Sequence, residues 1–219
     1  MIERGESRPG RVIVLNGGSS AGKTTLGRKL QGTLEGSWLL LGVDVLIWML
    51  PPRLIRNPEG LAVEDGVITR GNEFMRIYAA FRHSVAALAE DGIDILIDDV
   101  TLEAAADQRR WDESLEGLDV CWVAVRCAPD VAEARERTRG DRAWGTARRH
   151  ALTVHEGVRY DVEVDSEALD LAQSVGVIAD AVKQRWGVDS VAATNDAPEL
   201  PVLSALTTEG EIARAPWET

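Results

Sequence analysis

A short glycine-rich stretch, "GGSSAGKT" at Gly17–Thr24, constrains the fold of this chain more than any other feature. It satisfies the pattern G-x-x-x-x-G-K-[ST], follows the apolar run "RVIVLNG" and opens the helical segment "GKTTLGRKLQGTL". In that setting the backbone N–H groups of the turn converge on phosphate oxygens, and the helix N-terminus adds the positive end of its dipole. The sequence therefore predicts an α/β fold that binds a nucleoside triphosphate at this turn.

Each residue of the turn has an expected part in that binding. Lys23 is expected to reach the β and γ phosphates, Thr24 to offer its hydroxyl to Mg²⁺, and Thr25 to contact the α phosphate. The expected nucleotide-binding residues are Gly17, Gly18, Ser19, Ser20, Ala21, Gly22, Lys23, Thr24 and Thr25. The cofactors predicted are ATP and Mg²⁺, although the turn alone does not separate ATP from GTP.

Apolar runs alternate with helical segments along the rest of the chain. After the first run come "SWLLLGV", "IDILIDDV", "DVCWVAVRC" and "YDVEVDS". Helices are expected at "FMRIYAAFRHSVAALAEDG", Leu102–Leu115, Pro129–Arg137 and Glu167–Trp186. Because buried parallel strands read as apolar runs and need helical crossovers, the alternation predicts a central five-stranded parallel sheet flanked by helices.

We expect one domain, residues 1–186, and two segments that fit the alternation poorly. Pro51–Glu73 is punctuated by proline and glycine, which predicts an excursion of the chain. It is either a lid on the side where a phosphate acceptor would bind or a plain surface loop. Gly187–Thr219 lacks sustained periodicity and is expected to be a flexible tail or a strap over the surface, with no catalytic role.

Bulk composition excludes several classes of partner. A net charge of -12 and a pI near 4.8 argue against sequence-independent binding to nucleic acid or to an anionic membrane. The polar N-terminus and the lack of a long apolar run predict a cytoplasmic protein without a membrane span. Cys121 and Cys127 would lie roughly 20 Å apart along a strand, so we expect inert core thiols. The oligomeric state stays open, a homo-oligomer included.

Two adjacent carboxylates end the apolar run "ILIDDV". At this place a Walker-B-like carboxylate holds Mg²⁺ directly or through water. We favour Asp98 for the metal, together with Thr24. Asp99 then has the ordinary use of such a residue, which is to cap the helix that follows.

Positive charge gathers in residues 134–150, "ARERTRGDRAWGTARRH". Arg139 and Arg142 flank Gly140, which predicts guanidinium groups on a turn that closes over the triphosphate, excludes water and stabilises charge on the transferring phosphoryl group. Arg135 and Arg137 have the alternative of a solvated helix paired with neighbouring acids.

A single carboxylate, Asp44, interrupts the apolar run "SWLLLGVDVLIWML". Ligands of open α/β sheets bind just beyond the carboxyl ends of the strands, so Asp44 is expected to face that crevice. Trp48 follows one helical turn later and could stack on an apolar acceptor. Trp48 and Phe74 are thus candidate acceptor contacts, with the ordinary core as the alternative for both.

With these residues assembled, the chain resembles the chloramphenicol phosphotransferase family of small P-loop kinases. The matching pieces are "VLNGGSSAGKT", "GVDVLI", "IDILIDDV", "LDVCWVAVRC", "ERTRGDR" and "VHEGVRYDVEVDS", in that order over Arg11–Ile178. The resemblance implies a P-loop kinase fold with an arginine-bearing lid at Arg139 and Arg142. It also implies ATP-dependent phosphorylation of an antibiotic's primary hydroxyl, with Asp44 as the base that faces it.

Several readings stay open beside that one. Analogy with nucleotide kinases makes Asp165 and Ser166 candidate neighbours of the adenine. The acceptor could also be a nucleoside, a sugar acid or a similar hydroxylated metabolite. A nucleotide-dependent regulatory ATPase would share the phosphate-binding turn, but it would not need Asp44 or the arginine lid.

Overall fold

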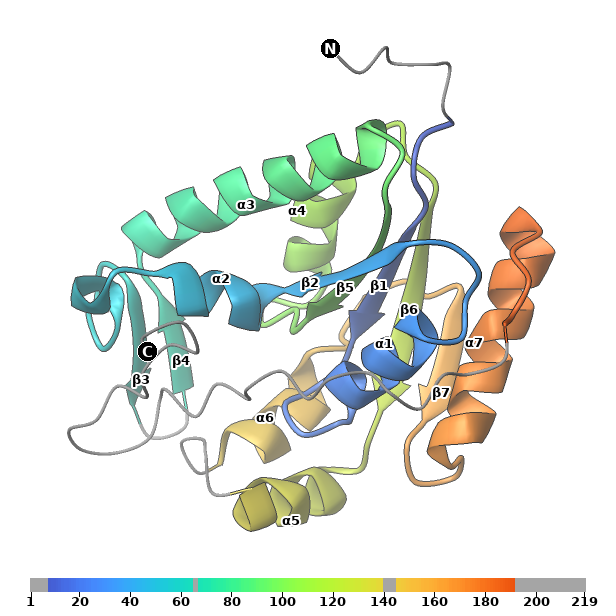
Figure 1. The fold of residues 1–219 in the computed structure, drawn as a ribbon. Coiled ribbons are helices and arrows are strands. Elements are labelled where there is room, and N and C mark those ends of the chain that lie inside the picture. Colours follow the sequence, from blue (N-terminus) through green and yellow to red (C-terminus); the bar gives the residue numbers. More distant parts are fainter. Residues whose placement is uncertain (1–7, 65–66, 140–144, 192–219) are drawn as a thin grey trace, which may run out of the picture.

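The computed structural model describes residues 8–64, 67–139 and 145–191 of the 219-residue chain. Its centre is a sheet of five parallel strands in the order β2-β5-β1-β6-β7 (Figure 1). The strands are β1 (Val12–Asn16), β2 (Trp38–Gly42), β5 (Asp94–Asp99), β6 (Val120–Arg126) and β7 (Val162–Asp165). The five apolar runs all form strands, so the predicted parallel sheet is confirmed.

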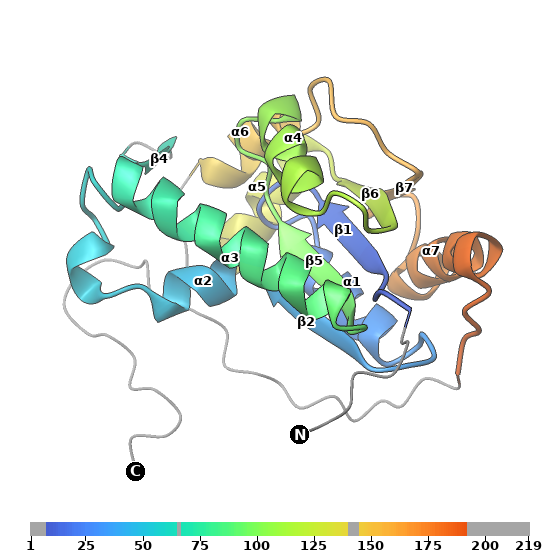
Figure 2. The same ribbon diagram turned by 90° about the horizontal axis from the view of Figure 1, so that it is seen from above.

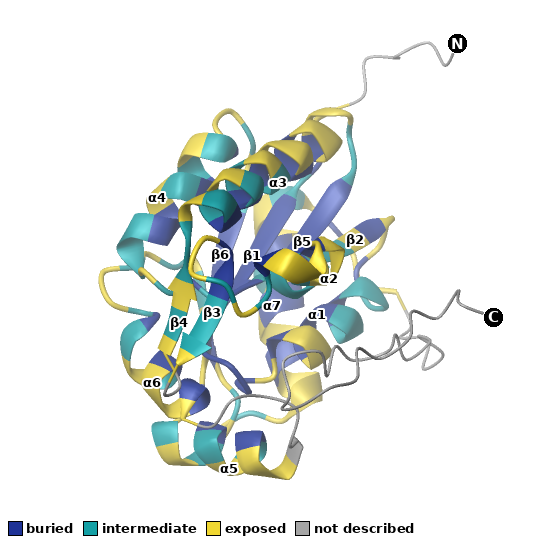
Figure 3. Cartoon of the chain, turned by 90° about the vertical axis from the view of Figure 1, so that its left-hand side faces the viewer, coloured by how far each residue is buried: buried dark blue, intermediate teal, exposed yellow. Residues whose placement is uncertain are grey.

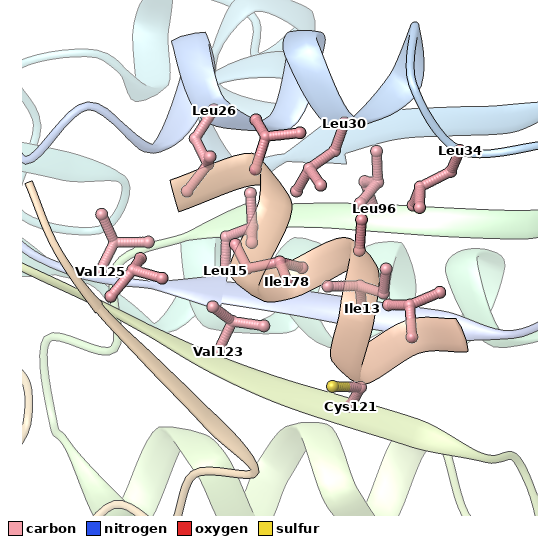
Figure 4. Close-up of a cluster of buried hydrophobic side chains, with 14 of the residues drawn as sticks. Ile13, Leu15, Leu26, Leu30, Leu34, Leu96, Cys121, Val123, Val125 and Ile178 are labelled. Atoms are coloured by element: carbon pink, nitrogen blue, oxygen red, sulfur yellow. The ribbon is translucent and has the colours of Figure 1, made fainter. Parts of the chain in front are cut away.

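The central strand β1 contributes side chains to two hydrophobic cores, because its side chains alternate between the two faces of the sheet. Ile13 and Leu15 lie in the core beneath helices α1 (Lys23–Gln31) and α7 (Leu171–Trp186), as Figure 4 shows. Val12 and Val14 lie in the opposite core with Trp111. All four of these β1 residues are fully buried.

Helices cover both faces of the sheet, α1 and α7 on one and α3 (Asn72–Glu90) and α4 (Ala105–Ser114) on the other (Figure 2). The last helix begins at Leu171 and not at the expected Glu167. Asp170 forms a capping box with Gln173, and that pair of hydrogen bonds sets the start of the helix. None of the described helices is long and apolar enough to cross a membrane.

The excursion between β2 and α3 contains regular structure of its own. Helix α2 (Val43–Met49) follows β2 directly, and a 3₁₀ turn at Pro52–Leu54 leads to an antiparallel hairpin. The hairpin consists of β3 (Leu61–Glu64) and β4 (Val67–Arg70) and lies beyond the carboxyl ends of the parallel strands (Figure 1). Pro51–Glu73 is therefore an excursion, as predicted, and its described part contains a hairpin.

Two further helices, α5 (Pro129–Arg139) and α6 (Thr146–Thr153), come after β6. Glu136 is 4% exposed, and its carboxylate accepts hydrogen bonds from the backbone N–H groups of Gly145 at 3.0 Å and Ala147 at 2.9 Å. This buried carboxylate satisfies N–H groups at the start of α6 and ties that helix to α5.

Three of the predicted features lie at or beyond the ends of the described segments. Arg139 is the last residue of α5, whereas Arg142 lies outside the described residues. The start of the predicted tail runs beside the end of α1, where Ser190 forms a bridge with Leu34. The tail beyond residue 191 lies outside the described residues as well.

Both cysteines are buried and unpaired. Burial, with the neighbouring Asp161, raises the pKa of Cys121 to about 12, which keeps the thiol protonated and unreactive. Cys121 packs in the core on the side of α1 and α7 (Figure 4).

Candidate active site

The phosphate-binding turn has the backbone geometry that the motif predicts. Gly22 adopts a φ of +96°, in the left-handed region that glycine tolerates best, and α1 begins at the next residue, Lys23. A Cβ atom on Gly18 would lie 3.0 Å from the backbone nitrogen of Ala151. Glycine at that position lets α6 pack directly on the turn.

Two side chains of the turn suit an anionic ligand. The hydroxyl of Ser20 is buried and has no hydrogen-bond partner among the described residues. The Lys23 ammonium is 6% exposed, donates a hydrogen bond to the carbonyl of Gly18 at 3.0 Å, and lies 3.7 Å from the Asp98 carboxylate. A buried donor without an acceptor and a buried cation above a helix N-terminus are the features that nucleotide phosphates would satisfy.

Asp98 lies beside the turn. The Thr24 hydroxyl donates to Asp98 Oδ2 at 2.5 Å, so the two groups predicted to hold Mg²⁺ contact each other. The described residues contain no group of three His, Cys, Asp or Glu that could hold a metal by itself. Magnesium typically takes one or two protein oxygens and completes its coordination with water and substrate phosphates, so Thr24 and Asp98 fit it.

Asp99 has a different environment from its neighbour. It is 1% exposed and accepts hydrogen bonds from the Tyr78 hydroxyl, from Trp111 Nε1 at 2.6 Å and from the backbone N–H of Val100 at 2.7 Å. Burial outweighs these donors and raises the pKa of Asp99. Its expected use as a helix cap is wrong, because the N-cap of α4 is Ala104 and carries no side-chain cap.

Asp44 lies in the first turn of α2 and lines a small cavity of about 40 Å³. The cavity is also lined by Ser20, Gly22, Lys23, Thr24, Thr25, Val43, Asp98 and Val100. β2 and β5 are adjacent parallel strands, and their carboxyl ends bring Asp44 and Asp98 to the same edge of the sheet. Asp44 therefore faces the crevice beside the phosphate-binding turn.

The two aromatic acceptor candidates differ in exposure. Trp48 is 42% exposed and lies one turn after Asp44 on α2. Figure 3 shows that α2 carries exposed residues. Phe74 is 0% exposed and packs against Tyr78 with ring centroids 5.7 Å apart. Phe74 is thus a core residue of α3 and has no surface to offer an acceptor, which corrects the expectation for that position.

A larger cavity of about 830 Å³ adjoins the turn on the side of α5 and α7. Ser20, Gly22 and Thr25 line both cavities, while Leu26, Val125, Val131 and Leu169 belong to the apolar wall of the larger one. An apolar cavity continuous with a phosphate site suits a nucleoside base.

The two residues expected near that base, Asp165 and Ser166, have different positions relative to the cavity. Ser166 lines the cavity, whereas Asp165 accepts a hydrogen bond from the backbone N–H of Glu167 at 2.8 Å. Arg135 donates to the hydroxyl and to the carbonyl of Ser166, each at 3.0 Å, so its alternative as a solvated surface residue is wrong. Arg137 does pair with a neighbouring acid, Glu133, at 2.6 Å.

A buried hydrogen-bond network behind the turn was not expected from the sequence. Asn16 Nδ2 donates to the Tyr160 hydroxyl at 2.6 Å and to the Val154 carbonyl at 3.0 Å, while Asn16 Oδ1 accepts from the backbone N–H of Thr101 at 3.1 Å. Asn16 precedes the turn and Thr101 follows the Asp98–Asp99 pair, so one amide links the two. Apart from Thr101, the residues of the network lie in the stretches "LNGG" and "VHEGVRY". Neither stretch has a spacing of residues from which such contacts could be predicted.

His155 completes this network. Its Nδ1 lies 2.7 Å from the Tyr160 hydroxyl. Burial, reinforced by the nearby Arg126, lowers the pKa of His155 to about 4, so the imidazole is neutral near pH 7. Burial also raises the pKa of Tyr160 to about 12, which keeps its hydroxyl protonated.

The parallel sheet with a glycine-rich turn between β1 and α1 is the P-loop kinase fold. Solved structures with the same fold include APS kinase from Mycobacterium tuberculosis, which is 14% identical with a TM-score of 0.56 over 80% of this chain and 98% of that one. They also include a gluconokinase from Sinorhizobium meliloti 1021 (17% identical, TM-score 0.54, 82% and 95% covered). A third is the tunicamycin resistance protein of Deinococcus radiodurans (18% identical, TM-score 0.56, 83% and 99% covered). At these identities the likeness concerns the fold alone.

Sequence comparison assigns the family. The family described as chloramphenicol phosphotransferase-like protein matches residues 10–183. A Mycobacterium tuberculosis protein named "Putative O-phosphotransferase" is 32% identical over 174 residues, which cover 73% of this chain and 76% of the relative. The chain belongs to the chloramphenicol phosphotransferase-like family and is a phosphotransferase, as the resemblance predicted.

Proposed function

We propose that this phosphotransferase uses ATP and Mg²⁺ to phosphorylate a hydroxyl group of a small molecule, an antibiotic such as chloramphenicol or a related compound. The observation that carries the proposal is one cavity that Lys23, Thr24, Asp44 and Asp98 line together. It combines a cation and metal ligands for the phosphates with a separate carboxylate for the acceptor.

Asp44 acts as the base in this proposal. Phosphoryl transfer depends mostly on positioning and on stabilisation of charge, so the base needs only to accept or orient the proton of the attacking hydroxyl. Asp98 contacts Lys23 and Thr24. Asp44 comes from α2, the helix that follows the neighbouring strand β2. One carboxylate is thereby assigned to the nucleotide and the other to the acceptor.

The remaining groups act on the nucleotide. Lys23 stabilises charge on the β and γ phosphates, and the larger cavity beside Ser166 receives the adenine. Thr24 and Asp98 would hold Mg²⁺, which would neutralise charge on the phosphates. Arg139 and Arg142 are proposed to stabilise the transferring phosphoryl group and to exclude water, which limits hydrolysis of ATP.

The acceptor class rests on the family and on α2. The family is described by its likeness to chloramphenicol phosphotransferase, and the named relative is described as an O-phosphotransferase. Val45, Trp48 and Met49 are 39%, 42% and 58% exposed, and they follow Asp44 on α2. This apolar surface next to the base suits an acceptor with an aromatic or aliphatic body and a reactive hydroxyl.

A phosphate-transfer screen tests the proposal. Purified protein is incubated with ATP, Mg²⁺ and a panel of hydroxylated antibiotics, nucleosides and sugar acids, and products are detected by mass as an added phosphoryl group. We expect a chloramphenicol-like compound to gain the phosphoryl group. Transfer to a metabolite alone would replace the antibiotic with a metabolic acceptor, and ATP hydrolysis unchanged by every acceptor would favour a regulatory ATPase.

A further inference from the structure

A network of four ionised side chains joins the hairpin to the loop after β5. Arg70, the last residue of β4, has a side chain that is only 6% exposed. Its Nη2 lies 2.6 Å from Glu103 Oε1 and 3.0 Å from Asp107 Oδ2, and the Asp107 side chain is 3% exposed. Arginine and aspartate are almost never so buried unless they are paired, so this contact is a specific one.

A second arginine completes the network on the side of α4. Arg110 contacts Asp107 Oδ1 at 2.6 Å through Nη1 and Glu103 Oε2 at 2.7 Å through Nη2. Asp107 also accepts a hydrogen bond from the backbone N–H of Glu103 at 3.0 Å. Two positive and two negative charges therefore balance, and Arg70 is the one member that comes from the hairpin.

Within the part of the chain that the structure describes, the outer strand β4 of the hairpin has no fully buried side chain. β3 is anchored by Leu61, which is 3% exposed in the core, but the residues of β4 alternate between exposed and half-buried. Val67 is 40% exposed, while Ile68 packs only partly against the core. Because an isolated two-stranded hairpin is marginally stable at best, the ion pairs of Arg70 add to the hold on β4 that comes from its connection to α3 and from the hydrogen bond of Gly71 N–H to the Gly60 carbonyl at 2.7 Å.

The network also connects two segments that adjoin the proposed site in sequence. Glu103 and Asp107 follow β5, the strand that ends with Asp98 and Asp99. The hairpin follows α2, the helix that carries Asp44. Arg70 thus ties the segment on the acceptor side to the loop on the nucleotide side.

We propose that Arg70 is a positioning residue that holds the β3–β4 hairpin as one wall of the acceptor site. The role as a wall of the acceptor site rests on the proposed function. The attachment of the hairpin by Arg70 does not depend on that function. An arginine that meets two carboxylates fixes both distance and orientation, which an apolar contact of similar size would not do. Loss of the guanidinium should free the wall without disturbing the phosphate-binding turn.

The test compares Arg70→Met with Arg110→Met. Both variants remove an arginine that contacts Glu103 and Asp107, but only the first detaches the hairpin. For Arg70→Met we expect about a tenfold rise in the KM of the acceptor found in the screen, with kcat and the KM of ATP within about twofold; tenfold corresponds to about 1.4 kcal/mol. Arg70→Lys should restore part of the loss, and Arg110→Met should leave the acceptor KM near its wild-type value.

A second measurement needs neither acceptor nor nucleotide. Amide hydrogen exchange of a peptide over residues 59–71 should speed up in Arg70→Met and stay near the wild-type rate in Arg110→Met, while peptides of the phosphate-binding turn exchange as before. If Arg70→Met does not fold, Glu103→Gln removes the half-exposed partner and should give a smaller change in the same direction.

The outcomes separate this proposal from the proposed function. Equal changes in Arg70→Met and Arg110→Met, or unchanged exchange over residues 59–71, would overturn the attachment of the hairpin by Arg70. Faster exchange with an unchanged acceptor KM would overturn the acceptor wall. If the wild-type protein phosphorylates none of the hydroxyl compounds, the proposed function fails, and the exchange measurement still decides the attachment.

Discussion

Asp98 and Asp99 are adjacent in sequence and have opposite environments. A strand turns successive side chains to opposite faces, so one carboxylate meets the phosphate-binding turn while the other enters the core between α3 and α4. The same residue type therefore serves a proposed metal site at one position and an internal hydrogen-bond network at the next.

The pair yields a contrast between two variants. Asp98→Asn should abolish most Mg²⁺-dependent transfer with little change in the melting temperature. Asp99→Asn removes a charged acceptor from Tyr78 and Trp111, and hydrogen bonds to charged groups are worth about 1.5–3 kcal/mol, so its main effect should be a lower melting temperature. Steady-state transfer assays and thermal melts measure both, and the reverse pattern would reassign the metal to Asp99.

Asp44 allows the role of the base to be tested alone. Asp44→Asn keeps the size of the side chain and removes its ability to take a proton, so transfer should fall by about 10²- to 10⁴-fold, the usual span for a general base. The affinity for ATP, measured by calorimetry, should be nearly unchanged, because the proposal assigns the nucleotide and its metal to Asp98, which contacts Lys23 and Thr24. A large loss of ATP affinity would place Asp44 on the nucleotide side.

At the scale of elements, the contacts behind the turn join segments that are remote in sequence. The Asn16 amide binds the chain after β5 and the chain after α6 at once, and Tyr160 extends the network to His155. The phosphate-binding turn is therefore held from behind by two segments, the chain after β5 and the chain between α6 and β7. Contacts that position a binding turn in advance lower the cost of ordering it on binding.

The neutral His155 makes stability depend on pH. Its pKa is about 4 in the folded protein and about 6.5 in the unfolded chain, so the unfolded chain binds more protons between these values. The stabilising contribution is complete above pH 6.5 and is lost as the pH falls toward 4. Thermal melts from pH 7 to pH 4.5 should show a smaller fall for His155→Gln than for the wild type. His83→Gln, at an exposed histidine on α3, is the control and should follow the wild type.

At the scale of the whole molecule, binding at the turn stabilises both cores. Strand β1 contributes to both cores and runs directly into the turn, so a ligand that binds only the folded turn opposes unfolding of the domain. The stabilisation does not require any contact between the ligand and the core.

ATP with Mg²⁺ should therefore raise the melting temperature. At a nucleotide concentration 100 times the dissociation constant the gain is about 2.7 kcal/mol. Lys23→Ala should abolish phosphate transfer and most of this shift while its melting temperature without nucleotide stays close to that of the wild type. Differential scanning fluorimetry with and without ATP and Mg²⁺ measures both, and a full shift in the variant would remove Lys23 from the nucleotide site.

Much of the fold was predictable because its signals are local. The conformation of the glycine-rich turn depends on residues adjacent in sequence, and an apolar run forms a strand wherever it can pair with another. The stretch "GGSSAGKT" and the five runs therefore predicted the sheet and the phosphate site. The start of α7 was displaced because a cap at Asp170, and not hydrophobic periodicity, determines it.

The remaining site depends on contacts that no local pattern encodes. The sequence favoured Asp98 for the metal but wrongly made Asp99 a helix cap, and it did not separate Trp48 from Phe74. Burial decides the use of these residues, and burial follows from how α2, α3 and α4 pack on the sheet. The ion pairs of Arg70 likewise join residues more than thirty positions apart. The amino-acid sequence by itself determined the nucleotide-binding fold and the family. Only the tertiary structure decided that Asp99 lies in the core and that Arg70 joins the hairpin to Glu103 and Asp107, because these depend on distances between elements that meet only in the folded chain.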